Sequence, residues 1–475
     1  MSVIATTPKF KENAHAALSD TRLQGALSFS RNFAVRRAAA ADRLPEFEAL
    51  RDSARAIKDH TLTHLDLYLA AYEEKVRESG GHVHYAEDAE EARRIIIDLC
   101  RFFDAKSVTK GKSMIAEEIG LNDALEAAGM EPVETDLGEY IIQLRHEAPS
   151  HIIAPAIHVT KKDVEQEFRK AHRDLPANRD LSKPEALLAE ARAILRAKFL
   201  AADVGITGAN FLIAETGTSI IVTNEGNGDL TQILPKAHIV IASIEKIVPT
   251  LEDAAQLLRV LSRSATGQDM SVYTTLSTGP RRLDDPDGPS AYHVVILDNG
   301  RSNMLGGEFE DMLRCIRCGA CMNHCPVYQA VGGHAYGWVY PGPMGAVLTP
   351  SLIGVAEGGQ LPNASTFCGR CEQVCPVRIP LPKMMRHWRE REFERRLSPA
   401  PLRYGLGFWA FFAKRPALYR FATDVAARGL NLIGRSKGRL KWAPLASGWT
   451  EYRDLVAPQG ATFQRQWRAK SGATT

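Results

Sequence analysis

Seven of the eight cysteines lie between positions 315 and 375, and their spacing is the strongest chemical signal in the chain. The first group has the pattern C-x-x-C-x-x-C-x-x-x-C-P and consists of Cys315, Cys318, Cys321, Cys325 and Pro326. This pattern is typical of a cubane iron–sulfur cluster, whose four irons need thiolates that converge on one small volume. A zinc site needs only two C-x-x-C pairs and explains neither the third spaced cysteine nor the C-P ending. We therefore expect iron–sulfur chemistry.

A second group repeats most of the same pattern and consists of Cys368, Cys371, Cys375 and Pro376. When the two groups are aligned on their C-P endings, Ser365 stands where the first cysteine of the second group should be. In two-cluster ferredoxins the last cysteine of each group ligates the other cluster. The first cluster is therefore expected to take Cys315, Cys318, Cys321 and Cys375. The second is expected to take Cys325, Cys368 and Cys371.

The second cluster is thus one thiolate short, and the sequence leaves three outcomes open. It could be a three-iron cluster, a four-iron cluster with oxygen or another group on its unique iron, or a cluster with a fourth ligand from elsewhere. Candidate ligands are Ser365, a hydroxide, His324, His334 or a group from a partner subunit. Ser365 could equally be an unligated polar turn residue. We favour two [4Fe-4S] clusters, with [3Fe-4S] as the alternative for the second, and expect unequal potentials because their ligands differ.

Each cluster passes one electron, whereas oxidising an alcohol, acid or thiol removes two. No nicotinamide or flavin fingerprint follows any expected strand, which argues against a self-contained dehydrogenase. The clusters therefore resemble a short electron wire. The glycine-rich run at residues 332–345 would let backbone amides approach the cluster sulfurs closely, although it could also be ordinary packing.

The elements that must position these cysteines fall into four expected segments. Residues 1–75 are expected to form a helical arm, and residues 76–300 an α/β domain of alternating helices and β-branched runs. Residues 301–385 are expected to form an α-helical ferredoxin-type domain with two clusters. Residues 386–475 read as a basic, aromatic and helical region. With 475 residues and 45% hydrophobic content, the chain is long enough for several packed cores.

Local signals predict particular elements of the α/β domain. Expected strands begin near His151, Phe211, Ser219, His238 and Tyr292. The second and third of these are separated only by residues 216–218, which predicts a hairpin whose Gly217 takes a positive φ. The patterns Ser182-x-x-Glu185 and Thr250-x-x-Asp253 predict helix starts, and the first of these helices should end near Gly205. The glycine-rich run Asn224-Glu-Gly-Asn-Gly228 is expected to be an ordinary turn rather than a phosphate loop.

Several polar residues of this domain are candidates for binding. A cluster at an expected helix start could bind a carboxylate or be solvated, and it contains Lys110, Lys112, Ser113, Glu117 and Glu118. A second candidate is the strand end formed by Glu215, Thr216, Gly217 and Thr218, which a tight hairpin would also explain.

Other singular residues have plainer interpretations. His151 and His158 flank an expected buried strand, and a hydrogen-bonded core histidine is the better interpretation of each. Arg281 and Arg282 could pair with an acid or form a surface pair. Cys100 lies in an apolar helical run and is expected to pack in the core.

Net charge is only +3, so global charge does not point to nucleic acid. The last 90 residues are basic, with 18 Lys and Arg against 6 Asp and Glu, and carry Trp388, Trp409, Trp442, Trp449 and Trp467. This suits a protein interface, which we prefer, or a peripheral membrane surface. The N-terminus lacks the apolar core of a secretory signal, and the apolar run at 405–413 is about half the length needed to cross a bilayer. We expect a cytoplasmic protein with reduced cysteines, and peripheral contact with the inner face of the cell membrane is the alternative.

The order of segments resembles the lactate utilization protein B family. The matching stretches are KGKSMIAEEIGLN, ETDLGEYIIQL, PSHIIAPAIH, ETGTSIIVTNEGNG, CIRCGACMNHCPVY and CGRCEQVCPVRIPLP. The resemblance implies a LUD domain with a fold similar to the NagB/RpiA/CoA-transferase group, followed by the two-cluster domain. It also implies a cysteine-rich partner subunit and a smaller LUD-domain subunit, with L-lactate oxidised to pyruvate across the complex. It identifies no catalytic base.

We therefore expect an oxidoreductase subunit that carries electrons in L-lactate oxidation. One alternative is a quinone-linked iron–sulfur subunit that serves another substrate, such as glycolate or glycerol phosphate. The other is a non-redox LUD-domain enzyme whose clusters are structural.

Overall fold

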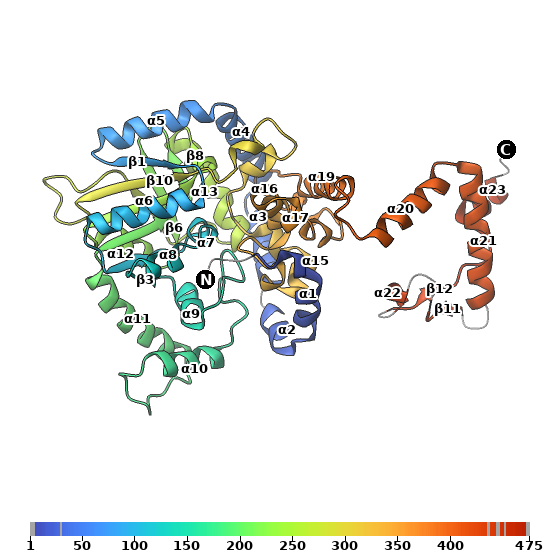
Figure 1. The fold of residues 1–475 in the computed structure, drawn as a ribbon, viewed down its shortest axis with the longest axis horizontal. Coiled ribbons are helices and arrows are strands. Elements are labelled where there is room, and N and C mark those ends of the chain that lie inside the picture. Colours follow the sequence, from blue (N-terminus) through green and yellow to red (C-terminus); the bar gives the residue numbers. More distant parts are fainter. Residues whose placement is uncertain (1–4, 29–30, 435–437, 443–446, 451–452, 472–475) are drawn as a thin grey trace. The chain divides into compact units, whose positions relative to one another are not determined.

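The structure is a computed structural model that describes residues 5–28, 31–434, 438–442, 447–450 and 453–471 (Figure 1). The chain divides into two compact units, Met1–Glu392 and Phe393–Thr475. Each unit is described by itself.

A six-stranded, entirely parallel sheet forms the centre of the first unit, with strand order β1-β10-β7-β4-β2-β3. Its strands are β1 (His82–Ala86), β2 (Ser107–Lys110), β3 (Glu131–Glu134), β4 (Val204–Gly208), β7 (Ala237–Ser243) and β10 (Ala291–Leu297). Every residue of β7 is buried, as expected for a parallel strand covered on both faces. The alternation of helices and β-branched runs in the sequence therefore corresponds to a mixed α/β domain.

Helices connect these parallel strands, as crossovers between parallel strands require. They are α6 (Ala89–Phe102), α7 (Met114–Glu118), α8 (Leu121–Ala127), α9 (Leu137–Arg145), α10 (Lys161–Ala171), α11 (Pro184–Ala201) and α12 (Asn227–Ile233). Cys100 lies on the buried face of α6 and is fully buried among apolar side chains, which confirms the core-packing prediction.

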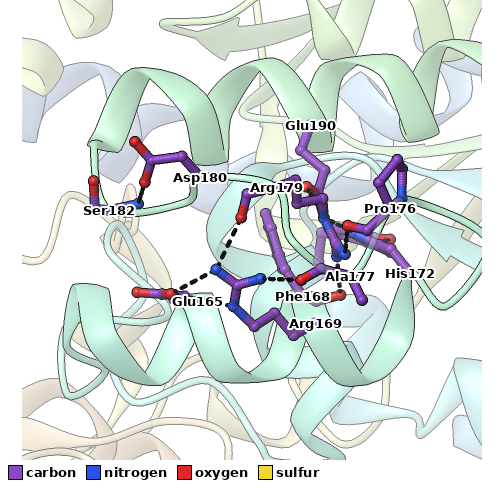
Figure 2. A network of polar contacts seen from close by, with 11 residues as sticks. Glu165, Phe168, Arg169, His172, Pro176, Ala177, Arg179, Asp180, Ser182 and Glu190 are labelled. Carbon is purple, nitrogen blue, oxygen red and sulfur yellow. Dashed lines mark hydrogen bonds and ion pairs between the residues drawn. The ribbon is translucent and has the colours of Figure 1, made fainter.

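The connection between α10 and α11 is held by a polar network (Figure 2). Arg169 donates to the carbonyl oxygens of Ala177 and Arg179. The guanidinium of Arg179 in turn pairs with the buried Glu190 at 2.7 Å, and Glu190 also contacts His172 at 2.7 Å. These contacts satisfy the loop carbonyls that no strand or helix would pair.

A smaller four-stranded sheet has the order β8-β5-β6-β9 and contains β5 (Phe211–Ile213), β6 (Thr218–Thr223), β8 (Ile247–Val248) and β9 (Tyr273–Ser277). β5 and β6 are antiparallel and form the predicted hairpin. Gly217 has a φ of +69° there, as predicted. A Cβ at this position would lie 2.5 Å from the Val76 amide nitrogen on α5 (Leu65–Glu78), so the turn needs glycine for its conformation and for space.

Two local predictions are wrong for identifiable reasons: the strand at His151 and the cap at Ser182, although α11 begins at Pro184, within the predicted start. No strand begins at His151, because its Nδ1 accepts hydrogen bonds from the Ile153 and Ala154 amides and turns the backbone. Ser182 does not cap α11, whose N-cap is Lys183; the Ser182 amide donates to Asp180 instead, at 2.9 Å.

The end of α11 and the glycine-rich turn also differ from expectation. α11 ends at Ala201, because β4 already begins at Val204 and takes Gly205 into the sheet. The turn at 225–228 is not an ordinary turn between strands, since Asn227 begins α12. The predicted cap at Thr250 is present, and its hydroxyl accepts from the Asp253 amide at 3.1 Å at the start of α13 (Leu251–Ala265).

The N-terminal segment packs against the cysteine-containing segment as well as the sheets. Its helices are α1 (Phe10–Ser19), α2 (Thr21–Leu27), α3 (Arg31–Asp42), α4 (Phe47–Thr63) and α5 (Leu65–Glu78). One continuous apolar core contains side chains from α1 and α4, from the smaller sheet, from α13 and from the cysteine region, and Ala41 of α3 packs against it. In Figure 1, α1 and α2 lie beside α15, one of the helices of the cysteine region.

Short helices dominate the cysteine region. They are α14 (Ala320–Asn323), α15 (Pro326–Val331), α16 (Gly342–Ile353), α17 (Val355–Gly358), α18 (Arg370–Gln373) and α19 (Leu381–Glu394). Glycines and prolines end most of them within a few turns, and the buried α16 begins at Gly342 and Pro343.

The second unit contains α20 (Ala400–Ala413), α21 (Pro416–Gly434), β11 (Arg439–Leu440), α22 (Ser447–Thr450), β12 (Leu455–Val456) and α23 (Phe463–Ser471). β11 and β12 form a short antiparallel pair. No side chain of α20 is buried, although the helix is rich in aromatic residues. Among the described residues, no helix combines the length and apolar character needed to span a bilayer.

Candidate iron–sulfur site and adjoining cavity

The two cysteine groups have the same local backbone. Gly319 and Gly369 are left-handed, with φ of +73° and +77°, and begin the four-residue helices α14 and α18. Arg317, just before Cys318, and Phe367, just before the equivalent Cys368, are also left-handed, with φ of +58° and +52°. These left-handed positions turn the chain sharply around successive cysteines. Because the turns match, Ser365 holds the position in its group that Cys315 holds in the other.

The first three cysteines lie together with the last cysteine of the second group. Burial raises the pKa of Cys318 to about 12, and the neighbouring Cys375 and Cys315 add to the rise. Burial likewise raises the pKa of Cys375 to about 11, and Cys315 adds to this. Burial raises the pKa of Cys321 as well, and Cys318 and Cys315 are the next largest causes. The fold thus gathers these four thiols.

The remaining three cysteines form a second neighbourhood. Burial and then Cys325 raise the pKa of Cys371 to about 12. Burial raises the pKa of Cys325, and Cys368 contributes. Cys368 is exposed, and its pKa is lowered chiefly by a hydrogen bond from the Arg370 amide. The two neighbourhoods have the same members as the crossed ligand sets predicted from the spacing. Ligation itself stays a prediction.

The chemistry of these donors fits iron–sulfur clusters. Thiols that burial and mutual repulsion keep protonated become thiolates when cations bind among them. Backbone amides also face the sulfurs: the Ile379 amide donates to Cys375 Sγ at 3.4 Å, and the Ala320 amide hydrogen bonds to Cys318. Such N–H to sulfur bonds are one means by which proteins set cluster potentials. Within the described residues, no group of three or more His, Cys, Asp or Glu side chains is arranged to hold a single metal ion.

The candidate fourth ligands of the second cluster differ in their surroundings. The Ser365 hydroxyl accepts a hydrogen bond from the Phe367 amide at 3.1 Å. His324 Nδ1 bonds the Ala320 carbonyl at 2.8 Å, and His334 Nε2 bonds the Ala148 carbonyl at 2.7 Å. One nitrogen of each histidine ring is therefore already engaged, whereas Ser365 occupies the position equivalent to a ligand cysteine. The identity of the fourth ligand stays a prediction.

The polar residues predicted to lie together at the start of α7 have different surroundings in the structure. Lys110 is buried and forms ion pairs with Glu117 at 2.9 Å and Glu134 at 2.7 Å. Glu118 is also buried and pairs with Arg301 at 2.6 Å. Lys110, Glu117 and Glu118 are therefore paired inside the protein, whereas Lys112 and Ser113 line a cavity.

The buried charges continue from Glu118 to the first cysteine group. Arg301 pairs with Glu245 at 3.2 Å, and Arg317, next to Cys318, pairs with the same Glu245 at 3.1 Å. Burial alone would raise the pKa of Glu245, but these two guanidinium groups lower it to about 2. Lys58 donates to the Glu245 carbonyl. A chain of buried ion pairs therefore links the parallel sheet to the first cysteine group.

A cavity of about 240 Å³ lies beside this chain of charges. Residues that follow three parallel strands line it: Gly111, Lys112 and Ser113 after β2; Gly208, Ala209 and Asn210, at and after the end of β4; and Lys246 after β7. The carboxyl ends of parallel strands are where open α/β sheets bind ligands. Arg317 and Cys318 also line it, so the cavity reaches the first cysteine group.

The other sequence candidates lie elsewhere. Residues 215–218 do not line the cavity; the Glu215 carboxylate accepts from the Leu251 amide at the start of α13. His151 is buried and hydrogen bonded to Asn323 at 2.9 Å, which confirms its interpretation as a core histidine. His158 similarly bonds Glu147 at 2.8 Å. Arg281 and Arg282 are exposed.

The sequence reasoning missed Lys246, Asn224 and Asn227, all of which line the cavity. A signal for Lys246 was present, because the pair Glu245-Lys246 interrupts the otherwise apolar run that begins at His238. A charged pair inside a buried run marks a paired or functional site. The two asparagines belong to the glycine-rich turn that was interpreted as ordinary.

Comparison with known proteins matches three family descriptions in order along the chain. "LUD domain" covers residues 69–297, "4Fe-4S dicluster domain" covers 311–379, and "Lactate utilisation protein B, C-terminal" covers 403–472. The chain therefore has a LUD domain followed by a 4Fe-4S dicluster domain.

Curated relatives match over the full length. The chain is 43% identical to "Lactate utilization protein B" of Bacillus licheniformis over 472 residues, covering 98% of each chain. It is 43% identical to the protein of the same name from Bacillus subtilis, covering 99% of this chain and 98% of that one. It is 41% identical to the "Uncharacterized electron transport protein YkgF" of Escherichia coli, covering 100% of this chain and 99% of that one. A crystal structure of a DUF162 family protein from Deinococcus radiodurans matches 49% of this chain and 98% of that one, with 16% identity and a TM-score of 0.29.

Proposed function

The chain belongs to the lactate utilization protein B family, and from this premise we propose that it is the iron–sulfur electron-transfer subunit of a complex that oxidises L-lactate to pyruvate. The observation that carries the proposal is the gathering of seven cysteines into two adjoining neighbourhoods within the 4Fe-4S dicluster domain. An iron–sulfur role in lactate utilization agrees with the family's name and with this domain.

Two clusters would act as a relay. The first would be held by Cys315, Cys318, Cys321 and Cys375, and the second by Cys325, Cys368 and Cys371. Cys371 also contributes to the raised pKa of Cys321, after burial and nearer thiols, so the two neighbourhoods adjoin. We propose that both are [4Fe-4S] clusters and that the second has a non-cysteine ligand. Each would pass one electron at a time, so the removal of two electrons from lactate needs a further group in the complex.

We propose a cysteine-rich subunit and a smaller LUD-domain subunit as partners, and no nucleic acid. The C-terminal unit supports a docking role, because α20 carries exposed Phe408, Trp409 and Phe411 and is followed by Lys414 and Arg415. Aromatic and arginine side chains are enriched in protein interfaces. We place the complex in the cytoplasm, where thiols stay reduced. We also propose a fold of the NagB/RpiA/CoA-transferase type for the LUD domain, which the six-stranded parallel sheet supports.

Anaerobic purification of the chain with its partners tests the function. We expect about eight irons and about eight sulfides per chain and bleaching of the cluster absorbance when L-lactate is added. The proposal fails if intact oxygen-free preparations contain no acid-labile sulfide or if lactate leaves the clusters oxidised. Bleaching by glycolate or glycerol phosphate in place of lactate would identify a different substrate, and clusters inert across the biological potential range would identify structural clusters.

Liposome flotation tests the role of the C-terminal unit. We expect that the chain without its partners does not float with vesicles that contain anionic lipid. Salt-sensitive flotation that is lost when Phe408, Trp409 and Phe411 are all replaced by serine would instead assign α20 to a membrane surface.

A further inference from the structure

The cavity beside the first cysteine group has two cationic side chains, Lys246 and Lys112, that form no ion pair within the described residues. Lys246 is 6% exposed and ends the short 3-10 helix Ile244–Lys246 that follows β7. Its neighbour Glu245 is already paired with Arg301 and Arg317. Within the described residues, the Lys246 ammonium makes no hydrogen bond or ion pair, although it lines the cavity. A buried charge without a partner is costly unless a ligand of opposite charge completes the site.

Lys112 enters the same cavity from the loop after β2. Unlike Lys110, two residues earlier, its ammonium has no hydrogen bond or ion pair to any described residue. The end of the strand separates the two lysines: Lys110 is the last residue of β2 and lies inside an ion-pair network, whereas Lys112 lies in the loop just beyond the strand. The site thus draws its cations from two different strand ends.

The cavity also carries groups that can accept hydrogen bonds. Asp136 and Glu225 line it together with the side chain of Asn227. Asn227 Oδ1 is buried and has no hydrogen-bond partner in the described structure. Arg317 Nε, at the side of the cysteine group, is a buried donor that likewise lacks a hydrogen-bond partner. Cations together with these acceptors, of which Asn227 Oδ1 has no partner, suit a molecule that has both a carboxylate and a hydroxyl group.

The size of the cavity restricts the ligand further. Sites for drug-sized molecules and cofactors span about 300–1,000 Å³, and this cavity measures about 240 Å³. It is therefore suited to a small molecule of a few heavy atoms rather than to a flavin or a nicotinamide dinucleotide.

We propose that this cavity binds a small 2-hydroxy carboxylate and its 2-oxo product, with Lys246 and Lys112 holding the carboxylate next to the first cluster site. This inference rests on the proposed function, which makes L-lactate and pyruvate the ligands to test. It assigns binding and placement of the ligand to this chain. Because Cys318 lines the cavity, the bound acid lies beside a ligand of the first cluster.

Isothermal titration calorimetry of the anaerobic, cluster-loaded full chain without partners tests the proposal, with L-lactate and pyruvate as titrants. We expect both to bind the wild-type chain. Lys246→Met and Lys112→Met each remove one charge and are expected to weaken binding about ten- to hundred-fold, because a charged hydrogen bond is lost. Lys236→Met is the matched control, since the Lys236 side chain is 72% exposed and lies outside the cavity.

Two further measurements separate the possible failures. The iron content of each variant shows whether its fold and clusters are intact. Lys246→Arg keeps the charge, so it shows whether weaker binding comes from the lost cation. If neither acid binds the wild-type chain, or if both methionine variants bind like the wild type, the cavity proposal is overturned even when lactate reduces the clusters of the complete complex. If the acids bind and the variants lose binding, the cavity proposal stands even when the complex fails to transfer electrons from lactate.

Discussion

At the scale of the residue, the two cysteine turns match except at Ser365, which has a hydroxyl oxygen where Cys315 of the first group has a sulfur. Its hydroxyl faces the Phe367 amide at 3.1 Å, within a turn whose glycine and left-handed positions repeat those of the first group. A thiolate at this position would complete the second set of ligands. The two proposed clusters differ in this ligand, and in exposure too, because Cys368 is exposed whereas Cys318 is buried.

Ser365→Cys is expected to alter the second cluster alone. The added thiolate brings negative charge to the unique iron and should lower the midpoint potential of that cluster by tens of millivolts, while the first stays unchanged. Redox titration followed by electron spin resonance measures both. Ser19→Cys adds a thiol on the exposed surface of α1 and is the control. A gain of iron in Ser365→Cys over the wild type would show that the native second cluster has three irons.

Buried histidines make the stability of the chain sensitive to mild acid. Burial lowers the pKa of His238 to about 3, and its Nε2 contacts the Thr207 hydroxyl at 2.8 Å. The unfolded chain binds this proton near pH 6.5, whereas the folded chain does not. The stabilising contribution is therefore complete above pH 6.5 and is lost as the pH falls toward 3, by about 1.4 kcal/mol per pH unit.

His238→Gln is expected to reduce this acid sensitivity. Between pH 7.5 and pH 5.5 the Tm of the wild type should fall about 2 °C further than that of the variant, which has no group to titrate at this position. Differential scanning calorimetry measures the difference. His15→Gln, at an exposed position on α1, should behave like the wild type. Equal losses in His238→Gln and the wild type would contradict the assignment.

The sequence predicts much of the chemistry at this scale but little of its surroundings. The cysteines and Ser365 could be recognised because cluster ligands follow fixed local spacings. Lys246 and Arg317 could not be placed together in advance, because a strand end and a cysteine turn separated by 70 residues meet only after the chain folds. Glu118 looked like a binding residue for the same reason, since its partner Arg301 is 183 positions away.

At the scale of the element, the β5–β6 hairpin shows how one turn joins the N-terminal segment to the smaller sheet. Gly217 fits directly against the backbone of Lys75 and Val76 on α5. Its positive φ would cost a residue with a side chain about 1–2 kcal/mol, before the clash with α5 is considered. The four residues that resembled a binding site at this turn are therefore explained by packing.

Gly217→Ala is expected to destabilise the chain by at least 2 kcal/mol and to lower its Tm, because α5 must move away from the turn. Gly226→Ala is a matched control: its φ is −76° and no atom lies within 4 Å of the added methyl group. Thermal unfolding followed by circular dichroism compares the two. Equal melting temperatures would mean that α5 yields without cost.

Strands and hairpins with alternating β-branched residues were predictable because their local pattern agrees with their burial in the fold. The segment at 151–158 was wrongly predicted as a strand because it is as apolar as one. Pro155 cannot donate to a sheet, and His151 satisfies the two following amides with its own ring. Side-chain bonds of this kind compete with strand pairing and leave no trace in hydrophobic periodicity.

At the scale of the whole molecule, the N-terminal helices hold the second cysteine group from outside. Arg51 on α4 donates to the carbonyls of Gln373 at 2.6 Å and Cys375 at 2.8 Å. Arg37 on α3 donates to the carbonyl of Val374 at 2.9 Å. These three successive carbonyls end the turn that delivers Cys375 to the first neighbourhood. The predicted helical arm is thus part of the support of the proposed clusters.

Arg51→Met is expected to loosen this turn. The loss of charged hydrogen bonds to buried carbonyls should cost about 2–3 kcal/mol and should speed bleaching of the clusters in air. Arg55→Met, on the same helix but with a 52% exposed side chain, is the control. Absorbance at cluster wavelengths after exposure to oxygen measures the rate. Identical decay in both variants would show that the contacts made by Arg51 do not support the clusters.

These contacts also order the events of biosynthesis. The ribosome releases Arg51 long before Cys375, which lies 324 positions further along, so α3 and α4 must wait for their partners. Until these helices dock, the carbonyls of Gln373, Val374 and Cys375 have no arginine donor, so the turn that carries Cys375 gains its outer support only after residue 375 has been synthesised.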